Sequence, residues 1–205
     1  MTAPDVVAVE LDPPAGSFGL SRISGPVGWF VWLGQLLSGD GSRWTHAWLV
    51  LDNDEIIEAQ PGGAKIQHIA ERYGHKSIVV CDKPVQNAVA DWVDEQLRND
   101  VVITKREVAV YEADLRTQIV KAARRLDGVP YAFRCYPALG LLALGVKPKR
   151  LRRWVKGSGY MICSMLVDFS YFINGMHLFN DGRESMDVTP GDLFRYSNDD
   201  FIFVL

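Results

Sequence analysis

The sequence predicts an α+β fold for this chain of 205 residues. Strand-like runs come mainly in the stretch that ends at Cys81, and the two clearest amphipathic helices follow it, so strands and helices do not alternate strictly. Hydrophobic residues make up 48% of the chain and charged residues 23%, a balance that allows a buried core and argues against disorder. The length fits one domain, or one domain with a large insertion.

The N-terminal part contains two signals. Residues 6–11 alternate weakly between apolar and polar side chains and predict a first strand, which Pro13 and Pro14 end. Residues 28–37 are almost entirely apolar and predict a short helix or turn, which the flexible run 38–41 stops.

Three strand-like runs follow at residues 47–52, 55–59 and 64–68, and a fourth lies at 78–81. Asn53 and Asp54 separate the first two runs, and both residue types tolerate the backbone of a tight turn. We therefore expect a hairpin there, with the next turn at residues 61–63.

Two helices are predicted after these strands. Residues 84–97 place apolar side chains at helical spacing behind Asp82, and Pro84 suits the first turn. Residues 115–126 form the second, with Asp114 as the N-cap and a stop at residues 128–130. Residues 108–111, which lie between the two, favour a strand.

The C-terminal part begins with an apolar run at 137–146 and a basic run at 147–156. Residues 160–173 predict a helix, residues 189–193 a capped single turn, and residues 201–205 a terminal strand. The apolar runs 27–37 and 137–146 are both too short to span a bilayer, which needs ~20 residues.

Composition excludes several classes of function. The formal net charge of -3 gives no overall attraction to nucleic acid or to an anionic membrane. The three cysteines lack CxxC spacing and histidine neighbours, so we expect no metal and no other cofactor, and their odd number leaves room for a free thiol. Residues 1–16 lack the features of a secretory signal. We expect a cytoplasmic protein, with signal-independent export or association with a virion left open.

Cys163 is the first candidate for chemistry. The small residues 157–159 lead into the predicted helix, which places Cys163 in its first turn. Free N–H groups at a helix start stabilise a thiolate and can hold the oxyanion that forms when a carbonyl is attacked. A buried core cysteine is the alternative interpretation.

His46 and Glu58 lie on either side of the predicted hairpin turn. Adjacent strands are ~5 Å apart, so the Glu58 carboxylate can reach the imidazole and fix its tautomer while the other ring nitrogen acts as a base. The alternatives are a half-buried histidine bonded to a backbone carbonyl and an ordinary cross-strand polar contact.

Four segments resemble one known family. SRWTHAWLVLDNDEIIEAQPGGAKIQ is similar to the histidine half of permuted NlpC/P60-type proteins, in which a strand with THxxLV runs into a hairpin that ends xIEA. GYMICSMLVDFSYF is similar to the cysteine half, usually CSELV at the head of a helix. DGVPYAF and MDVTPGDLF resemble the GxPYD and xxPxDL elements, and all four come in family order.

The resemblance implies a papain-like fold, with a small antiparallel sheet packed against the cysteine-bearing helix, in a single domain over residues 1–205 whose core spans about 38–194. His46 precedes Cys163, which is the permuted order shared by the YiiX-like and lecithin:retinol acyltransferase-like branches. The resemblance also suggests that Tyr131 lines the substrate site, with a core role as the alternative. Met165 and Ala132 replace acidic residues that are common in the family, and both changes can alter the pocket wall.

The other candidates match no element of the motif. We expect His68, His75 and His177 at the surface or in the core, and packing roles for Cys81 and Cys135. The basic run 147–156 is expected to be a solvated face, with binding to an anionic polymer, phosphate or lipid headgroup as the alternative.

We therefore expect a cysteine hydrolase that cleaves an amide or isopeptide bond through a thioester, with peptidoglycan-type peptides as substrate by resemblance. One alternative is an acyltransferase or lipid hydrolase, in which residues 137–156 would contact a membrane. Another is a non-catalytic structural or binding protein that keeps the fold, encoded for example by a phage.

Overall fold

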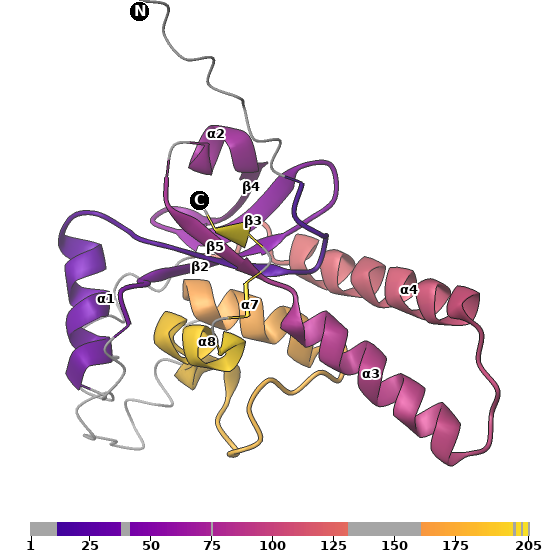
Figure 1. The fold of residues 1–205 in the computed structure, drawn as a ribbon. Coiled ribbons are helices and arrows are strands. Elements are labelled where there is room, and N and C mark those ends of the chain that lie inside the picture. The colour runs from indigo at the N-terminus through magenta and orange to yellow at the C-terminus, as the bar shows by residue number, and fades with distance from the viewer. Residues whose placement is uncertain are drawn as a thin grey trace, which may run out of the picture.

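The computed structural model describes residues 12–37, 42–74, 76–130, 161–198, 200–201 and 203–204. Figure 1 shows an antiparallel sheet with helices on both sides, which confirms the α+β class. The six strands are ordered β4-β3-β2-β1-β5-β6, and the outermost, β6, has only two residues. The strands are β1 (Phe18–Ser21), β2 (His46–Val50), β3 (Glu55–Gln60), β4 (Gly63–His68), β5 (Ile78–Cys81) and β6 (Phe203–Val204).

The predicted hairpin between β2 and β3 is confirmed. Asn53 and Asp54 both adopt positive φ angles, 57° and 56°, which Asn and Asp tolerate better than most residues. Leu49 pairs with Ile57, and Val50 pairs with Ile56. The second hairpin turns at Gly62 and Gly63, whose φ angles of 104° and 118° favour glycine.

The predicted strands at 64–68 and 78–81 are confirmed as β4 and β5, whereas β1 was missed by the sequence analysis. β1 is central and pairs antiparallel with β2 on one side and with β5 on the other. The first strand predicted at residues 6–11 lies outside the described residues. The terminal strand predicted at 201–205 is observed over the shorter range Phe203–Val204.

The helices are α1 (Pro26–Leu37), α2 (Ile69–Tyr73), α3 (Lys83–Arg98), α4 (Lys105–Arg124), α7 (Cys163–Phe172) and α8 (Pro190–Ser197), with a 3-10 turn, η2, at Ser185–Asp187. The predicted helix at 84–97 corresponds to α3. The segment predicted as a short helix or turn at 28–37 is α1, and Thr189 caps α8, which is longer than the predicted single turn.

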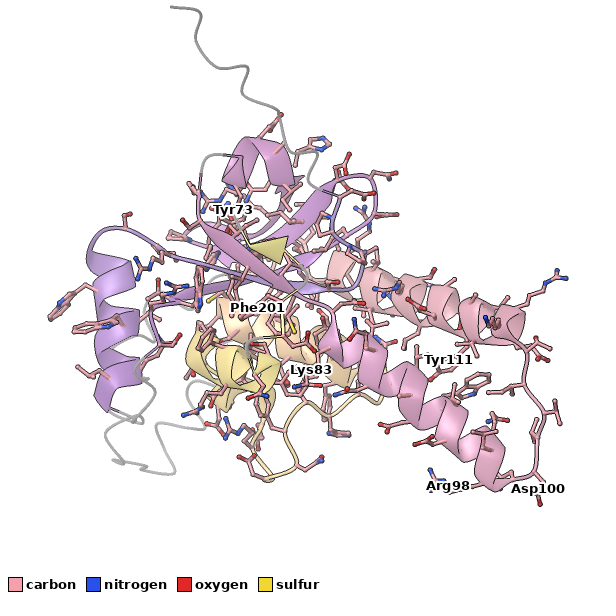
Figure 2. All side chains as sticks on the ribbon, viewed as in Figure 1. Tyr73, Lys83, Arg98, Asp100, Tyr111 and Phe201 are labelled. Carbon is pink, nitrogen blue, oxygen red and sulfur yellow. The ribbon has the colours of Figure 1, made fainter. Side chains whose placement is uncertain are left out.

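Helix α4 corrects two predictions. Residues 108–111 are helical rather than a strand, and Asp114 lies inside the helix rather than at its N-cap. The helix begins earlier because Thr104 and Glu107 form a capping box, in which each side chain accepts a hydrogen bond from the other residue's backbone N–H. Trp92 of α3 stacks on Tyr111 of α4, with ring centroids 4.5 Å apart. Figure 2 shows Arg98 and Asp100 at the far tip of this helix pair.

The sheet separates two apolar clusters. The larger one contains Ala47, Leu49 and Ile57 together with residues of α4 and α7. The smaller one contains Trp48 and Ile56 together with Ile69 and Tyr73 of α2. Side chains alternate between the two faces of a strand, so by this alternation His46 and Glu58 belong to the α2 face. Cys163 belongs to the opposite cluster.

Among the described helices, none combines the length and the apolar character that crossing a membrane requires. The basic run at 147–156 and the apolar run that precedes it lie outside the described residues, as do Tyr131, Ala132, Cys135 and His75.

Candidate active site

The predicted contact between His46 and Glu58 is present. His46 Nε2 and Glu58 Oε2 form a buried hydrogen bond, with the His46 side chain 1% exposed and the Glu58 side chain 0% exposed. If the β2–β3 register continues beyond its observed pairs, Glu58 lies diagonally across from His46 on the same face. Diagonal neighbours are within reach when one side chain is long, so the hairpin accounts for the contact.

The described backbone pairing of β2 with β3 stops short of His46. Their ladder contains only the pairs at Leu49 and Val50, so the backbone N–H of Ala47 has no partner on β3 among the described pairs. The backbone N–H groups of Ala47 and Ser164 lie near the Cys163 sulfur and help to lower the pKa of its thiol. The sulfur therefore lies close to the β2 backbone next to His46.

Cys163 is the first residue of α7, which confirms its predicted place in the first turn of a helix. The helix is anchored at both ends by buried hydrogen bonds. Ser164 Oγ donates to the carbonyl of Val188 at 2.6 Å, and Tyr171 Oη donates to the carbonyl of Gly16 at 2.6 Å. These contacts hold the sulfur in place relative to β1 and to the segment before α8.

Gln35 is the matching anchor on the histidine side. Its side chain is 2% exposed; its amide nitrogen donates to the carbonyl of Trp44 at 3.0 Å, and its amide oxygen accepts the N–H of Gly191 at 2.7 Å. This single side chain connects α1, the start of α8 and the residues that lead into His46. Sequence analysis missed it because a lone glutamine in an apolar helix carries no motif.

Cys163 and His46 influence each other electrostatically. Burial would lower the pKa of His46, but its interactions with the Cys163 thiolate and with Glu58 outweigh burial and raise that pKa from 6.5 to about 9. Burial would raise the pKa of Cys163, but His46 and the N–H groups of Ala47 and Ser164 lower it below 9.0. Both shifts favour a thiolate–imidazolium pair over two neutral groups.

The contact between sulfur and imidazole is looser than the contact with Glu58. With Nε2 bonded to Glu58, Nδ1 is left for Cys163, and Nδ1 makes no hydrogen bond of ordinary geometry with any described residue. Resting sites often have such loose contacts, which tighten when substrate binds. Cys163 is only 3% exposed, so a substrate carbonyl reaches the sulfur only after a local movement.

Glu58 stays ionised despite its burial. Burial would raise its pKa, but hydrogen bonds from His46, Tyr73 and Arg72, together with the His46 charge, lower it from 4.5 to about 2. Tyr73 Oη donates at 2.7 Å and Arg72 Nε at 2.5 Å, and Gln67 Nε2 donates as well. Sequence analysis missed all three donors. Only Gln67 could have been found, because strand alternation across the β3–β4 hairpin places it opposite Ile56.

The remaining candidates do not join this site. Cys81 is buried in the core, as predicted. His68 and His177 are exposed, and His177 packs edge-on against Phe172. In the described parts of the chain, no group of three or more His, Cys, Asp or Glu side chains is arranged to hold a metal ion.

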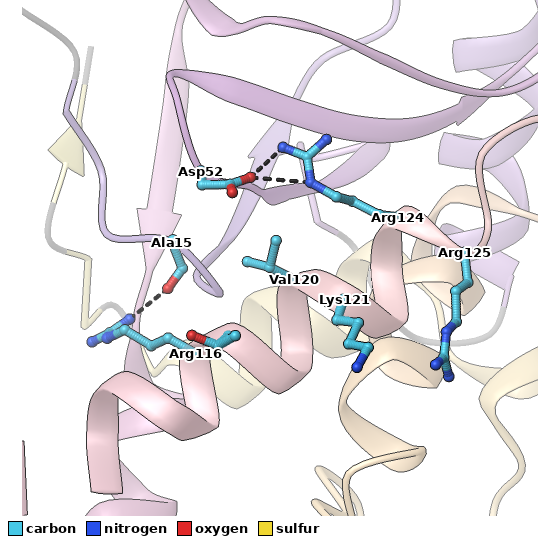
Figure 3. A pocket seen from close by; sticks show the side chains of 8 residues that line it. Ala15, Asp52, Arg116, Val120, Lys121, Arg124 and Arg125 are labelled. Atoms are coloured by element: carbon cyan, nitrogen blue, oxygen red, sulfur yellow. Dashed lines mark hydrogen bonds and ion pairs between the residues drawn. The ribbon is translucent and has the colours of Figure 1, made fainter. Parts of the chain in front are cut away.

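A surface hollow of about 470 Å³ lies elsewhere, between α4 and the end of β2 that is distant from His46 (Figure 3). Two of its arginines are already engaged, because Arg116 donates to the Ala15 carbonyl at 2.8 Å and Arg124 binds Asp52. It is lined by Ala15, Asp52, Arg116, Thr117, Val120, Lys121, Arg124 and Arg125. We assign the chemistry to the buried Cys163 site, because neither cysteine nor histidine lines this hollow.

Comparisons with models of known protein families, with curated proteins and with solved structures find no match to this chain.

Proposed function

We propose that the protein is a cysteine hydrolase of the permuted NlpC/P60 type, with a papain-like fold, that cleaves an amide or isopeptide bond. One observation carries the proposal: the Cys163 sulfur, at the first residue of α7, is electrostatically paired with a buried imidazole that Glu58 holds from the other side. Thiol catalysis requires a nucleophile, a base next to it and an acidic residue that orients the base.

The reaction begins when the Cys163 thiolate attacks the carbonyl carbon of the substrate and the carbonyl oxygen takes up the negative charge. Backbone N–H groups at the start of α7 are the candidates for holding this oxyanion. The imidazolium of His46 then gives its proton to the nitrogen of the leaving amine. The C–N bond breaks, the amine leaves, and the acyl group remains on the sulfur as a thioester.

Hydrolysis completes the cycle. His46, now neutral, takes a proton from water, and the hydroxide attacks the thioester carbonyl. The C–S bond breaks, the acid product leaves, and the thiolate–imidazolium pair is restored. Glu58 keeps the imidazole oriented through both halves and stabilises its charged form.

The choice of peptidoglycan-type peptides as substrate comes from the family resemblance of the segments around His46 and Cys163. The acyltransferase or lipid hydrolase alternative depends on residues 137–156, which lie outside the described residues, so no described contact favours it. The non-catalytic alternative does not account for four hydrogen bonds converging on one buried carboxylate beside a thiol, because burying charge costs free energy that an apolar core avoids.

The test is incubation of the protein with purified peptidoglycan peptides, and with ester substrates in parallel. We expect release of free amines by the wild-type protein, accompanied by an acyl adduct on Cys163 in its intact mass. Cys163→Ala is expected to reduce turnover by ~10³-fold or more, as removal of a nucleophile does. The matched control, Cys81→Ala, removes another buried thiol and should remain active.

The outcomes separate the three hypotheses. Cleavage of esters without cleavage of any amide would favour the lipid alternative. No adduct and no product from either substrate class, with the protein folded, would support the non-catalytic alternative.

A further inference from the structure

The two oxygens of Glu58 have different sets of partners. Oε2, which faces His46, also accepts the hydroxyl of Tyr73 at 2.7 Å. Oε1 accepts hydrogen bonds from Arg72 Nε at 2.5 Å and from Gln67 Nε2. Each oxygen thus receives two donors, and the carboxylate has little freedom to rotate.

Tyr73 is itself held rigidly. Its ring stacks on Trp48, with centroids 5.0 Å apart and an interplanar angle of 21°. Ser21 Oγ donates to the Tyr73 oxygen at 3.3 Å, so the phenol hydrogen is directed to Glu58. Trp48 lies directly over Gly19, where an added Cβ would come within 2.1 Å of the indole. The stack therefore depends on the absence of a side chain at Gly19.

Arg72 adds a positive charge at the opposite end of the carboxylate. In the reactive ionisation state, charges alternate from Cys163 (negative) through His46 (positive) and Glu58 (negative) to Arg72 (positive), and they sum to zero. Arg72 is the most solvent-exposed member of the set, with its side chain 30% exposed. An imidazolium between two anions without this cation would hold its proton more tightly.

We propose that Arg72 and Tyr73 are positioning residues for the reaction: Tyr73 fixes the Glu58 oxygen that faces His46, and Arg72 offsets the carboxylate charge so that His46 can release its proton to the leaving amine. This inference rests on the proposed function. It adds that α2, a helix of five residues on the face of the sheet opposite α7, sets the strength of the acid in the site.

The inference predicts a change in one limb of the pH profile. The pKa of His46, about 9 in the intact site, marks the loss of the imidazolium as the pH rises. Arg72→Gln removes the cation, so the pKa of His46 should rise by about 0.5–1 unit, and the alkaline limb of kcat should move upward with it. We expect kcat to fall by about 5–10-fold with KM little changed, because proton delivery to the amine is a transition-state event.

Three further variants complete the test. Arg72→Lys keeps the charge and should return the alkaline limb to near its wild-type position. Tyr73→Phe keeps the stack on Trp48 but removes one donor to Glu58, and should lower kcat by about 5–10-fold. Lys76→Gln is the matched control, because Lys76 Nζ lies 5.4 Å from the centroid of the Tyr73 ring and removing its charge leaves the four hydrogen bonds of Glu58 intact. It should leave kcat and the alkaline limb unchanged.

The measurement that decides the role of Arg72 requires no substrate. NMR titration of the His46 ring in the resting protein reports its pKa directly, and circular dichroism checks the fold of each variant. An unchanged His46 pKa in Arg72→Gln, or an equal shift in Lys76→Gln, would overturn the role of Arg72. Unchanged kcat in Tyr73→Phe would overturn that of Tyr73. A wild-type protein without turnover would contradict the proposed function alone, because the titration still tests the electrostatic link.

Discussion

Cys163 begins α7 and Cys81 ends β5 just before α3; both are buried, yet their surroundings shift the thiol pKa in opposite directions. Cys81 precedes α3 by two residues and receives the backbone N–H of Lys83. Burial nevertheless dominates there, and with the nearby charges of Asp200 and Asp82 it raises the pKa of Cys81 to about 11. At Cys163 the same cost of burial is overcome and the pKa falls.

The difference lies in the partner that each sulfur has. Cys163 has an imidazole that becomes a cation, held in its charged form by a carboxylate, whereas at Cys81 the charges of Asp200 and Asp82 oppose that of Lys83. A helix start contributes only part of the stabilisation of a thiolate, and here it is insufficient alone. The comparison indicates that His46, more than α7, makes Cys163 a candidate nucleophile.

The sharpest test of this comparison is the relative rate of alkylation. At pH 6–7 and low iodoacetamide concentration, Cys163 should react at least ~100-fold faster than Cys81, because only the thiolate is nucleophilic. Peptide mapping by mass spectrometry gives both rates, with the Cys135 peptide followed separately. In concentrated urea the two rates should become similar, which controls for intrinsic reactivity. Equal rates in the native protein would contradict an activated Cys163.

Glu58→Gln should bring the alkylation rates of Cys163 and Cys81 closer together. Without the carboxylate, the pKa of His46 falls and that of Cys163 rises, so the labelling ratio shrinks. The substitution also leaves a cation without its buried partner, and we expect the free energy of unfolding to fall by about 3–5 kcal/mol near pH 5–6. Urea unfolding monitored by circular dichroism measures this loss.

The loss of stability should depend on pH in a defined way. The carboxylate, with its pKa lowered from 4.5 to about 2, contributes fully above pH 4.5 and less as the pH falls through 2. The imidazolium, with its pKa raised from 6.5 to about 9, contributes fully below pH 6.5 and less as the pH rises through 9. The difference in the free energy of unfolding between wild type and Glu58→Gln should therefore be largest between pH 4.5 and 6.5 and should become smaller at lower and at higher pH. A constant difference would contradict the buried ion pair.

The smallest effect is expected far from both cysteines. Thr104→Ala removes the capping box of α4, in which Thr104 Oγ1 accepts the Glu107 N–H at 3.3 Å, and should cost about 1 kcal/mol of stability. Because α4 contacts neither sulfur through a described hydrogen bond, the alkylation ratio of Cys163 to Cys81 should not change. A change in that ratio would mean that general loosening of the fold contributes to the contrast.

The predictable parts of the fold are those set by nearby residues. Asn53 and Asp54 define a turn, and the strands on either side follow from alternation. The ends of β2 and β3 were therefore predicted to within two residues, the largest difference being at the end of β2. β1 was missed because four residues, FGLS, contain too little pattern, and its strand conformation depends on pairing with β2 and β5. In α4, the capping residues Thr104 and Glu107 were present in the sequence but outweighed by the apolar run at 108–111.

The residues of the candidate site also fall into those that local sequence indicates and those that it does not. Cys163, His46 and Glu58 stand in recognisable segments, and the contact between His46 and Glu58 follows from a hairpin. Arg72 and Tyr73 belong to a helix of five residues, too short to show helical periodicity. Their contact with Glu58 arises because β4 returns the chain past β3, which no local pattern records. The catalytic roles of all five residues stay predictions.

The turn at Asn53 and Asp54 also restricts which changes of chain length the site can accept. A longer turn there preserves the site only if the extra residues stay in the loop and the pairing of β2 with β3 is kept. A slip of that pairing by one residue would point the Glu58 side chain to the face opposite His46, and a slip by two would restore the face but displace the carboxylate along the strand. Evolution and protein engineering can therefore change the length of this loop only where the register of β3 survives.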